Sequence, residues 1–149
     1  MANKIFVFGH KNPDTDSIVS SIAMSNLRNE LGDNTECVRL GNINKETSFA
    51  LKTFNYKEPE LLTSVNNGDE VILVDHNEAT QSADNIENAH IRMVVDHHTI
   101  NFSTSETLYY IAEPVGCTAT ILYKLYKQND VEIKPSMAGL LLSAIISDT

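Results

Sequence analysis

Residues 5–32 decide the fold, and they read IFVFGHKNPDTDSIVSSIAMSNLRNELG. Residues 5–8 form an unbroken apolar run, which is typical of a strand buried on both faces of a parallel sheet. The polar segment 9–14 breaks this run, and from residue 17 to 31 apolar side chains recur at helical spacing until Gly32 supplies a stop signal. The segment therefore predicts a strand, a loop and a helix, in that order.

The same alternation continues through the rest of the chain. Further strands are expected at 36–40, 71–74, 91–95 and 108–112, and further helices at 45–54, at 116–128 and from Pro135 through Ile145. Strands that alternate with helices favour a parallel sheet joined by right-handed crossovers. No internal repeat, low-complexity tract or linker interrupts the pattern. We therefore predict a single α/β domain over residues 1–149, with a mostly parallel, Rossmann-like sheet flanked by helices.

Composition narrows the class of protein. The chain has 149 residues, 42% of them hydrophobic, which is enough for one domain with a core. No apolar run approaches the roughly 20 residues of a membrane-spanning helix, and nothing near Met1 resembles a signal peptide. The formal net charge of -9 argues against nucleic acid as a partner, because phosphate backbones are bound by clustered Lys and Arg. We expect a cytoplasmic protein without nucleic-acid or membrane partners.

The two cysteines, Cys37 and Cys117, are far apart in sequence, and neither belongs to a CxxC pair. Each lies among apolar or small neighbours, so we expect both to be reduced core thiols, as in a reducing compartment. We also expect no cysteine beside the metal-type side chains described next. Such an arrangement argues against a structural zinc site.

Metal-type side chains directly follow three of the predicted strands. The strand at 5–8 precedes His10, Asp14 and Asp16, the strand at 71–74 precedes Asp75 and His76, and the strand at 91–95 precedes Asp96, His97 and His98. Taken singly, each cluster has a plainer explanation, because Asp14 or Asp16 would cap the following helix and a lone histidine is more often structural. The carboxyl ends of parallel strands, however, meet at one edge of a sheet, where ligands bind. Three clusters at one edge favour a binding site.

The mixture of side chains indicates which cations fit. Carboxylate oxygens suit hard divalent ions, and imidazole shifts the preference toward transition metals, so an oxygen-rich mixed set favours manganese. Two divalent ions would neutralise carboxylates that otherwise repel one another. Metals that share a carboxylate lie about 3.5–4 Å apart in phosphoryl-transfer hydrolases, where a bridging hydroxide is a ready nucleophile. We therefore expect metal-dependent phosphoryl hydrolysis without a covalent phosphoenzyme.

Five segments in order resemble the successive motifs of family II inorganic pyrophosphatases, which belong to the Asp-His-His phosphoesterase superfamily. They are FGHKNPDTDS at 8–17, VDHNE at 74–78, VDHH at 95–98, EPVGCTAT at 113–120 and SAIISDT at 143–149. The resemblance extends from the first strand to the last residue. It implies hydrolysis of inorganic pyrophosphate to two phosphates by a dinuclear manganese centre, whose bridging hydroxide attacks in line.

The resemblance also implies which residues hold the cations. One Mn²⁺ would be bound by His10, Asp14 and Asp75, and the other by Asp16, Asp75, His97 and Asp148, so that Asp75 bridges the pair. Co²⁺ or Mg²⁺ are possible substitutes, and an additional Mg²⁺ would arrive with the substrate.

Neighbouring residues receive other roles from the same resemblance. His98 would face pyrophosphate as a hydrogen-bond donor, and Asp96 would orient an imidazole, although a role as a direct ligand stays open for Asp96. His76 and His90 are expected not to be ligands, and Arg92 is expected to be structural. For Lys11, a phosphate contact and a solvated surface role are equally open.

Family members carry a C-terminal domain whose Arg and Lys residues clamp pyrophosphate. This sequence ends within the last motif, so we expect residues 1–149 to be the N-terminal metal-binding catalytic domain, with the clamping domain absent. We expect such a fragment to fold and bind metal but to turn over pyrophosphate poorly or not at all, because the chain is acidic and its substrate is anionic. The family's dimerisation through an edge strand of this domain implies a homodimer.

Two competing hypotheses remain at this point. One is a phosphodiesterase of the same superfamily that acts on short or cyclic nucleotides. The 12–16 and 113–120 segments argue against it, and so does the lack of aromatic or basic nucleic-acid contacts. The other is a non-catalytic, metal-loaded dimerisation module.

Overall fold

The computed structural model describes residues 3–148, and a six-stranded sheet lies at its centre. The strands follow the order β3-β2-β1-β4-β5-β6, and every described pair is parallel. Their bounds are β1 Ile5–Phe8, β2 Thr35–Arg39, β3 Glu60–Leu61, β4 Glu70–Val74, β5 His90–Asp96 and β6 Tyr109–Ala112. The helices are α1 Thr15–Glu30, α2 Lys45–Thr53, α3 Thr118–Gln128 and α4 Pro135–Ser147. The predicted α/β class, with one parallel sheet in a single domain, is confirmed.

The three central strands, β1, β4 and β5, are the apolar runs that the sequence predicts. Successive side chains of a strand point to opposite faces of the sheet. Val7 thus packs with the helices, and Phe8 packs on the other face. Because both faces are covered, these strands need apolar residues at nearly every position.

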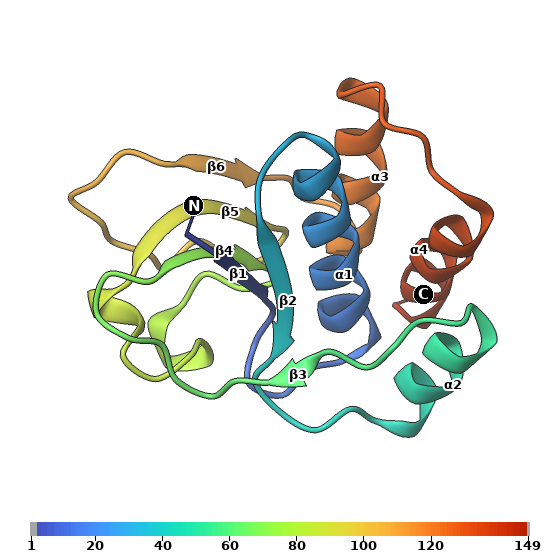
Figure 1. The fold of residues 1–149 in the computed structure, drawn as a ribbon, viewed down its shortest axis with the longest axis horizontal. Helices are drawn as coiled ribbons and strands as arrows, with labels where there is room; N and C mark the ends of the chain where they lie inside the picture. Colours follow the sequence, from blue (N-terminus) through green and yellow to red (C-terminus); the bar gives the residue numbers. More distant parts are fainter. Residues whose placement is uncertain (1–2, 149) are drawn as a thin grey trace.

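All four helices lie on one side of the sheet (Figure 1). The opposite side is covered by the connections 62–69, 75–89 and 97–108, which contribute Val65, Ala83, Ile86 and Phe102 to a second, smaller core. The connection between β4 and β5 contains only two short 3₁₀ helices, Ala79–Gln81 and Ile86–Asn88, where a doubly wound fold would carry a full helix. The helices therefore flank one face only.

The sequence interpretation missed β3, because a two-residue exposed strand has no periodicity to detect. It also contained no element in place of the two 3₁₀ helices, whereas the other strands and the four α-helices begin within two residues of their expected starts. Asp14 caps α1, since its side chain accepts a hydrogen bond from the backbone N–H of Ser17 at 2.9 Å. Pro135 occupies the first turn of α4, where its missing N–H costs nothing.

The strand order reverses between β1 and β4, since β2 and β3 lie on one side of β1 and the later strands lie on the other. In open parallel sheets this reversal opens a crevice at the carboxyl ends of the strands. His10 follows β1 and Asp75 follows β4, so both lie at that crevice. No helix within residues 3–148 is long and apolar enough to cross a membrane.

Candidate metal centre

Asp75 lies at the centre of the site and faces imidazoles on two sides. Its Oδ2 is 3.3 Å from His10 Nε2, and its Oδ1 is 3.2 Å from His97 Nε2. The residue is only 2% exposed, so the carboxylate is almost fully withdrawn from solvent. A carboxylate that uses each oxygen toward a different group has the arrangement needed to bridge two cations.

The backbone at Asp75 adopts an uncommon conformation, with φ of 59°. Left-handed backbone is rare in residues other than glycine, although Asp and Asn adopt it more readily than most. The N–H of Asp75 donates to the Val95 carbonyl at 3.0 Å, which continues the pairing of β4 with β5 past the end of β4. This turn directs the carboxylate across the sheet edge, and strained backbone of this kind is concentrated at functional sites.

Asp14 serves the fold and also lies beside the site. Its Oδ1 caps α1 and is 3.9 Å from His10 Nε2. His10, Asp14 and Asp75 each offer a ligand atom within 4.8 Å of the others. The capping interpretation is thus confirmed for Asp14, and it does not exclude a ligand role.

Asp16 is buried and is held by the N-terminus of α3. Its carboxylate accepts the backbone N–H groups of Thr118 at 2.8 Å and Ala119 at 2.9 Å. Its Oδ2 is also 3.8 Å from His97 Nε2. Asp148, which follows α4 directly, offers an oxygen within 4.8 Å of Asp16. All six residues expected to bind cations are therefore gathered at one sheet edge.

The ring of His97 is oriented by a hydrogen bond on the side away from Asp75, because its Nδ1 donates to the Val115 carbonyl at 3.0 Å. That hydrogen bond leaves Nε2, the atom that faces Asp75 and Asp16, as the ligand nitrogen, as in most histidine metal sites. The hydrogen bond to Asp75, together with the nearby carboxylate charges, raises the pKa of His97 to about 9. In the absence of cations the ring therefore carries a proton that balances the carboxylates.

The remaining groups show the same electrostatic pattern. Burial acts to lower the pKa of His10, but the hydrogen bond and charge of Asp75 outweigh burial and raise it. Burial likewise acts to raise the pKa of Asp75, but hydrogen bonds from His10 and His97 lower it overall. For Asp16, burial and the Asp75 charge raise the pKa. The clustered carboxylates therefore favour nearby positive charge, which either bound protons or metal cations can supply.

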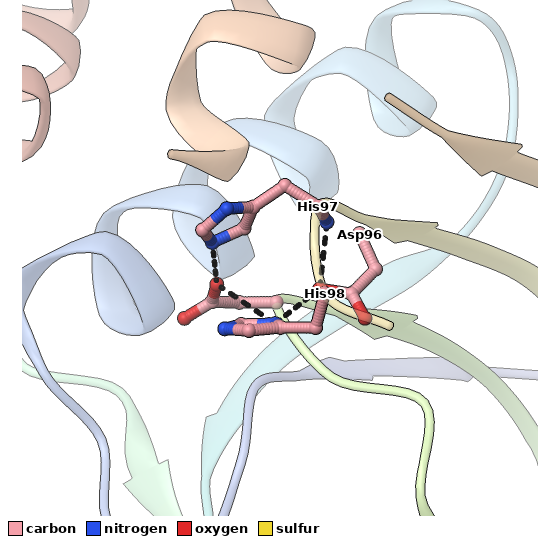
Figure 2. Close-up of side chains that lie close together, drawn as sticks. Asp96, His97 and His98 are labelled. Carbon is pink, nitrogen blue, oxygen red and sulfur yellow. Dashed lines mark hydrogen bonds and ion pairs between the residues drawn. The ribbon is translucent and has the colours of Figure 1, made fainter. Parts of the chain in front are cut away.

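Asp96 lies next to both histidines (Figure 2). Its Oδ1 accepts hydrogen bonds from His98 Nδ1 at 2.7 Å and from the backbone N–H of His97 at 2.8 Å. The rings of His97 and His98 are tilted against each other, with centroids 4.2 Å apart. The His98 side chain is 51% exposed and lines the pocket in front of the site.

The other His, Arg and Lys residues that the sequence analysis considered have hydrogen-bond or ion-pair partners outside the cation cluster. His76 is buried, with Nδ1 at 2.9 Å from the Val74 carbonyl and Nε2 at 2.9 Å from Ser82 Oγ, and burial lowers its pKa to about 4. His90 pairs with Glu106 on the surface. Arg92 lies 3.7 Å from Glu70 on the adjacent strand, and Lys11 lies 3.5 Å from Asp84.

The expectation that no cysteine lies near the metal-type side chains is wrong. Cys117 Sγ lies within 4.8 Å of ligand atoms of Asp16 and Asp148, because α3 begins directly above Asp16. Burial raises the pKa of the Cys117 thiol, so the sulfur stays protonated at neutral pH and is a poor metal ligand. Both cysteines are free thiols.

Two residues of the site were within the quoted motifs but received no role from the sequence. Thr118 donates its hydroxyl to Asp75 Oδ1 at 3.1 Å. Asn77 donates its amide to Asp96 Oδ2 at 2.8 Å. Because both residues lie within the quoted motifs, the sequence indicated that they are near the site. It could not indicate which atoms they contact, because those contacts depend on tertiary packing.

An open pocket of about 410 Å³ lies in front of the site. Its lining residues are His10, Asp75, His76, Glu78, Gln81, His98 and Thr99. A small anion has room to reach His98 and the outer face of Asp75 there. The carboxylates at the pocket, however, repel an anion that arrives without cations.

A parallel sheet whose central strands end in converging carboxylates and imidazoles defines an α/β domain with a candidate metal centre. The chain belongs to the DHH family, since residues 4–145 match the model described as "DHH family, N-terminal domain".

Curated proteins with similar sequences carry a more specific name than the family. The chain is 62% identical over 147 residues to a protein of Oceanobacillus iheyensis and 60% identical over 149 residues to one of Bacillus licheniformis, both named "Probable manganese-dependent inorganic pyrophosphatase". These alignments cover 98% and 99% of this chain but 48% of each relative. The chain thus spans about half the length of the curated relatives it matches.

Solved structures agree on the fold. A crystal structure from Methanococcus jannaschii, described as a putative family II inorganic pyrophosphatase, matches with a TM-score of 0.89 at 45% identity, over 98% of this chain and 48% of that one. An exopolyphosphatase-related protein of Bacteroides fragilis matches with a TM-score of 0.72 at 17% identity, which supports the fold alone.

Proposed function

We propose that the whole protein hydrolyses inorganic pyrophosphate to two phosphates with a pair of divalent cations, and that this chain supplies the half that binds them. The observation that carries the proposal is the placement of Asp75, whose two oxygens face His10 and His97 at 3.3 and 3.2 Å. The names of the curated relatives support the same activity.

The donor atoms present fit manganese. His10, Asp14 and Asp75 would hold one cation, and Asp16, Asp75, His97 and Asp148 would hold the other. Such a set is rich in oxygen with one imidazole on each side, which suits Mn²⁺ better than a thiophilic ion. The protonated thiol of Cys117 does not change this preference, and Co²⁺ or Mg²⁺ are possible substitutes.

The bound cations would polarise phosphoryl oxygens and activate a water molecule for in-line attack. The residues of this chain would orient the substrate. His98 would contact pyrophosphate through Nε2, and because its Nδ1 donates to Asp96, Nε2 acts as a donor only when the ring is protonated. An additional Mg²⁺ would accompany the substrate and offset its charge.

We further propose that this chain alone binds cations with little or no turnover. Its net charge of -9 opposes a polyanionic substrate, and the relatives it matches are about twice as long. The half of such a relative that this chain does not match would supply the cationic clamp.

The test compares this chain with a version extended by the second half of the O. iheyensis relative. Bound Mn²⁺ and phosphate release from magnesium pyrophosphate are measured for both, with cleavage of a dinucleotide as the competing activity. We expect both proteins to bind about two Mn²⁺ and only the extended one to release phosphate rapidly. Dinucleotide cleavage without phosphate release would refute the pyrophosphatase proposal, and fast release by the short chain would refute its inactivity.

A homodimer through β6 is a further part of the proposal. β6 is the last strand of the sheet, so its outer backbone groups are unpaired within residues 3–148, and Tyr109 is 74% exposed. Light scattering with and without Mn²⁺ should give twice the chain mass, and a Tyr109→Lys variant should weaken the dimer. A monomeric mass under both conditions would contradict it.

A further inference from the structure

The side chain of Asn77 is buried, and both of its N–H donors and its carbonyl oxygen form hydrogen bonds across the sheet edge. The residue follows β4 by three positions and is 3% exposed. Its Nδ2 donates to Asp96 Oδ2 at 2.8 Å and to the Thr99 carbonyl at 3.1 Å. Its Oδ1 accepts the backbone N–H of Asn101 at 2.7 Å. All three partners lie on the segment that ends β5, and none lies on its own segment.

These contacts continue to His98 through Asp96. Asn77 holds Oδ2 of the Asp96 carboxylate, while Oδ1 of the same carboxylate accepts from His98 Nδ1 at 2.7 Å. A carboxylate whose two oxygens have separate fixed partners cannot rotate freely about its terminal bond. The orientation of the His98 ring, and which of its nitrogens carries the hydrogen, therefore depend on a side chain that does not touch the ring.

The chemistry at position 77 requires a carboxamide. The side chain must donate twice, to a carboxylate and to a carbonyl, and accept once from a backbone N–H, which only an amide of this length can do. A carboxylate at this position would face Asp96 with like charge and leave the Thr99 carbonyl without a donor. A residue that only filled space would leave an oxygen of the buried Asp96 carboxylate without its donor, and it would also remove the hydrogen bonds to the Thr99 carbonyl and the Asn101 N–H.

We propose that Asn77 is a positioning residue, which fixes the Asp96 carboxylate and the 97–101 turn and thereby holds His98 toward the pocket with Nε2 outward. The inference rests on the proposed function in one respect, namely that His98 is the side chain that faces pyrophosphate. The proposal adds Asn77, which follows β4, to the residues that determine how substrate is bound.

The test is carried out on the metal-free chain, by ¹⁵N NMR of the imidazoles at a pH where His98 is neutral. The wild-type ring should be present as the Nδ1–H tautomer, because Nδ1 donates to Asp96. In Asn77→Ala and the milder Asn77→Ser, the ratio of the two tautomers should fall by about fivefold, the effect of one hydrogen bond. Asn101→Ala is the matched control, since only the backbone N–H of Asn101 takes part in the network and the ratio should not change.

A second measurement separates positioning from general support of the site. Mn²⁺ affinity, followed by EPR, should stay within about twofold of wild type in Asn77→Ser, because none of the expected ligands contacts Asn77. An unchanged His98 tautomer in a folded Asn77 variant would overturn the proposal. Loss of the folded spectrum in both variants would overturn it as well, since Asn77 would then be a structural residue. Neither measurement uses pyrophosphate, so the outcome is independent of whether the hydrolysis proposal holds.

Discussion

The carboxylate of Asp16 accepts the backbone N–H of Thr118 at 2.8 Å, although the two residues are 102 positions apart in sequence. The first N–H groups of α3 have no partner within the helix and donate to this carboxylate instead. The positive end of the helix dipole also favours the negative charge of the carboxylate. α1 and α3 therefore meet at the site through one side chain. The packing of these helices and the position of Asp16 depend on each other.

Asp75→Asn should abolish the paired site. The amide nitrogen cannot bind a cation, so one bridging oxygen is lost and the affinity for Mn²⁺ should fall by at least about 100-fold, more than loss of an outer partner costs. Isothermal titration with Mn²⁺ measures this. Asp84→Asn, which removes an exposed carboxylate paired with Lys11, is the control and should bind like wild type. Equal affinities in the two variants would exclude Asp75 as a ligand.

Gly41→Ala should disturb the loop that carries His10 and Asp14. A Cβ at residue 41 would lie 2.2 Å from the backbone oxygen of Lys11, so the loop must move. We expect a loss of about 1–3 kcal/mol in unfolding free energy, measured in urea, and a roughly tenfold weaker affinity for Mn²⁺. Gly116→Ala is the control, because its Cβ would meet no atom within 4 Å. Similar losses in both variants would point to backbone entropy and not to the clash.

The metal-free chain should lose stability as the pH rises from 6.5 to 9. The pKa of His97 is raised from 6.5 to about 9 by Asp75, so its protonated ring stabilises the fold fully below pH 6.5 and stops doing so as the pH passes 9. The raised pKa of Asp16 acts in the same direction. Thermal melting in EDTA should show the decline, and Mn²⁺ should suppress it because cations replace the protons. A melting temperature that rises over this range would contradict the electrostatic account.

Acid should destabilise the chain through His76. Burial lowers its pKa from 6.5 to about 4, so the neutral ring contributes stability above pH 6.5 that is lost as the pH falls toward 4. His76→Gln should show a flatter dependence of unfolding free energy on pH in this window, even if it is less stable throughout. The interpretation fails if His76→Gln keeps the wild-type slope.

The sequence was sufficient to predict the sheet edge where the site lies, because β1, β4 and β5 are apolar runs that end directly in His and Asp. It could not predict that Asp14 both caps α1 and approaches His10, since capping and ligand roles share one pattern. The proximity of Cys117 to Asp16 and the role of Asn77 depend on how α3 and the 97–101 turn dock, and no local periodicity encodes that docking. The face without helices was also unexpected, since the polar 75–89 connection forms only short 3₁₀ turns.

His10 follows β1 and lies beside Asp75, whereas Asp148 follows the last helix and lies beside Asp16, and the two groups meet at His97. Cations bound there would link the first loop to the end of α4. They would bind only when α4 is fully docked against the sheet edge, which is the closed state. By mass action, free cation at about a hundred times its dissociation constant would favour the closed state by about 2.7 kcal/mol. Manganese supply would then add to the equilibrium stability of the folded protein, in addition to any catalytic use.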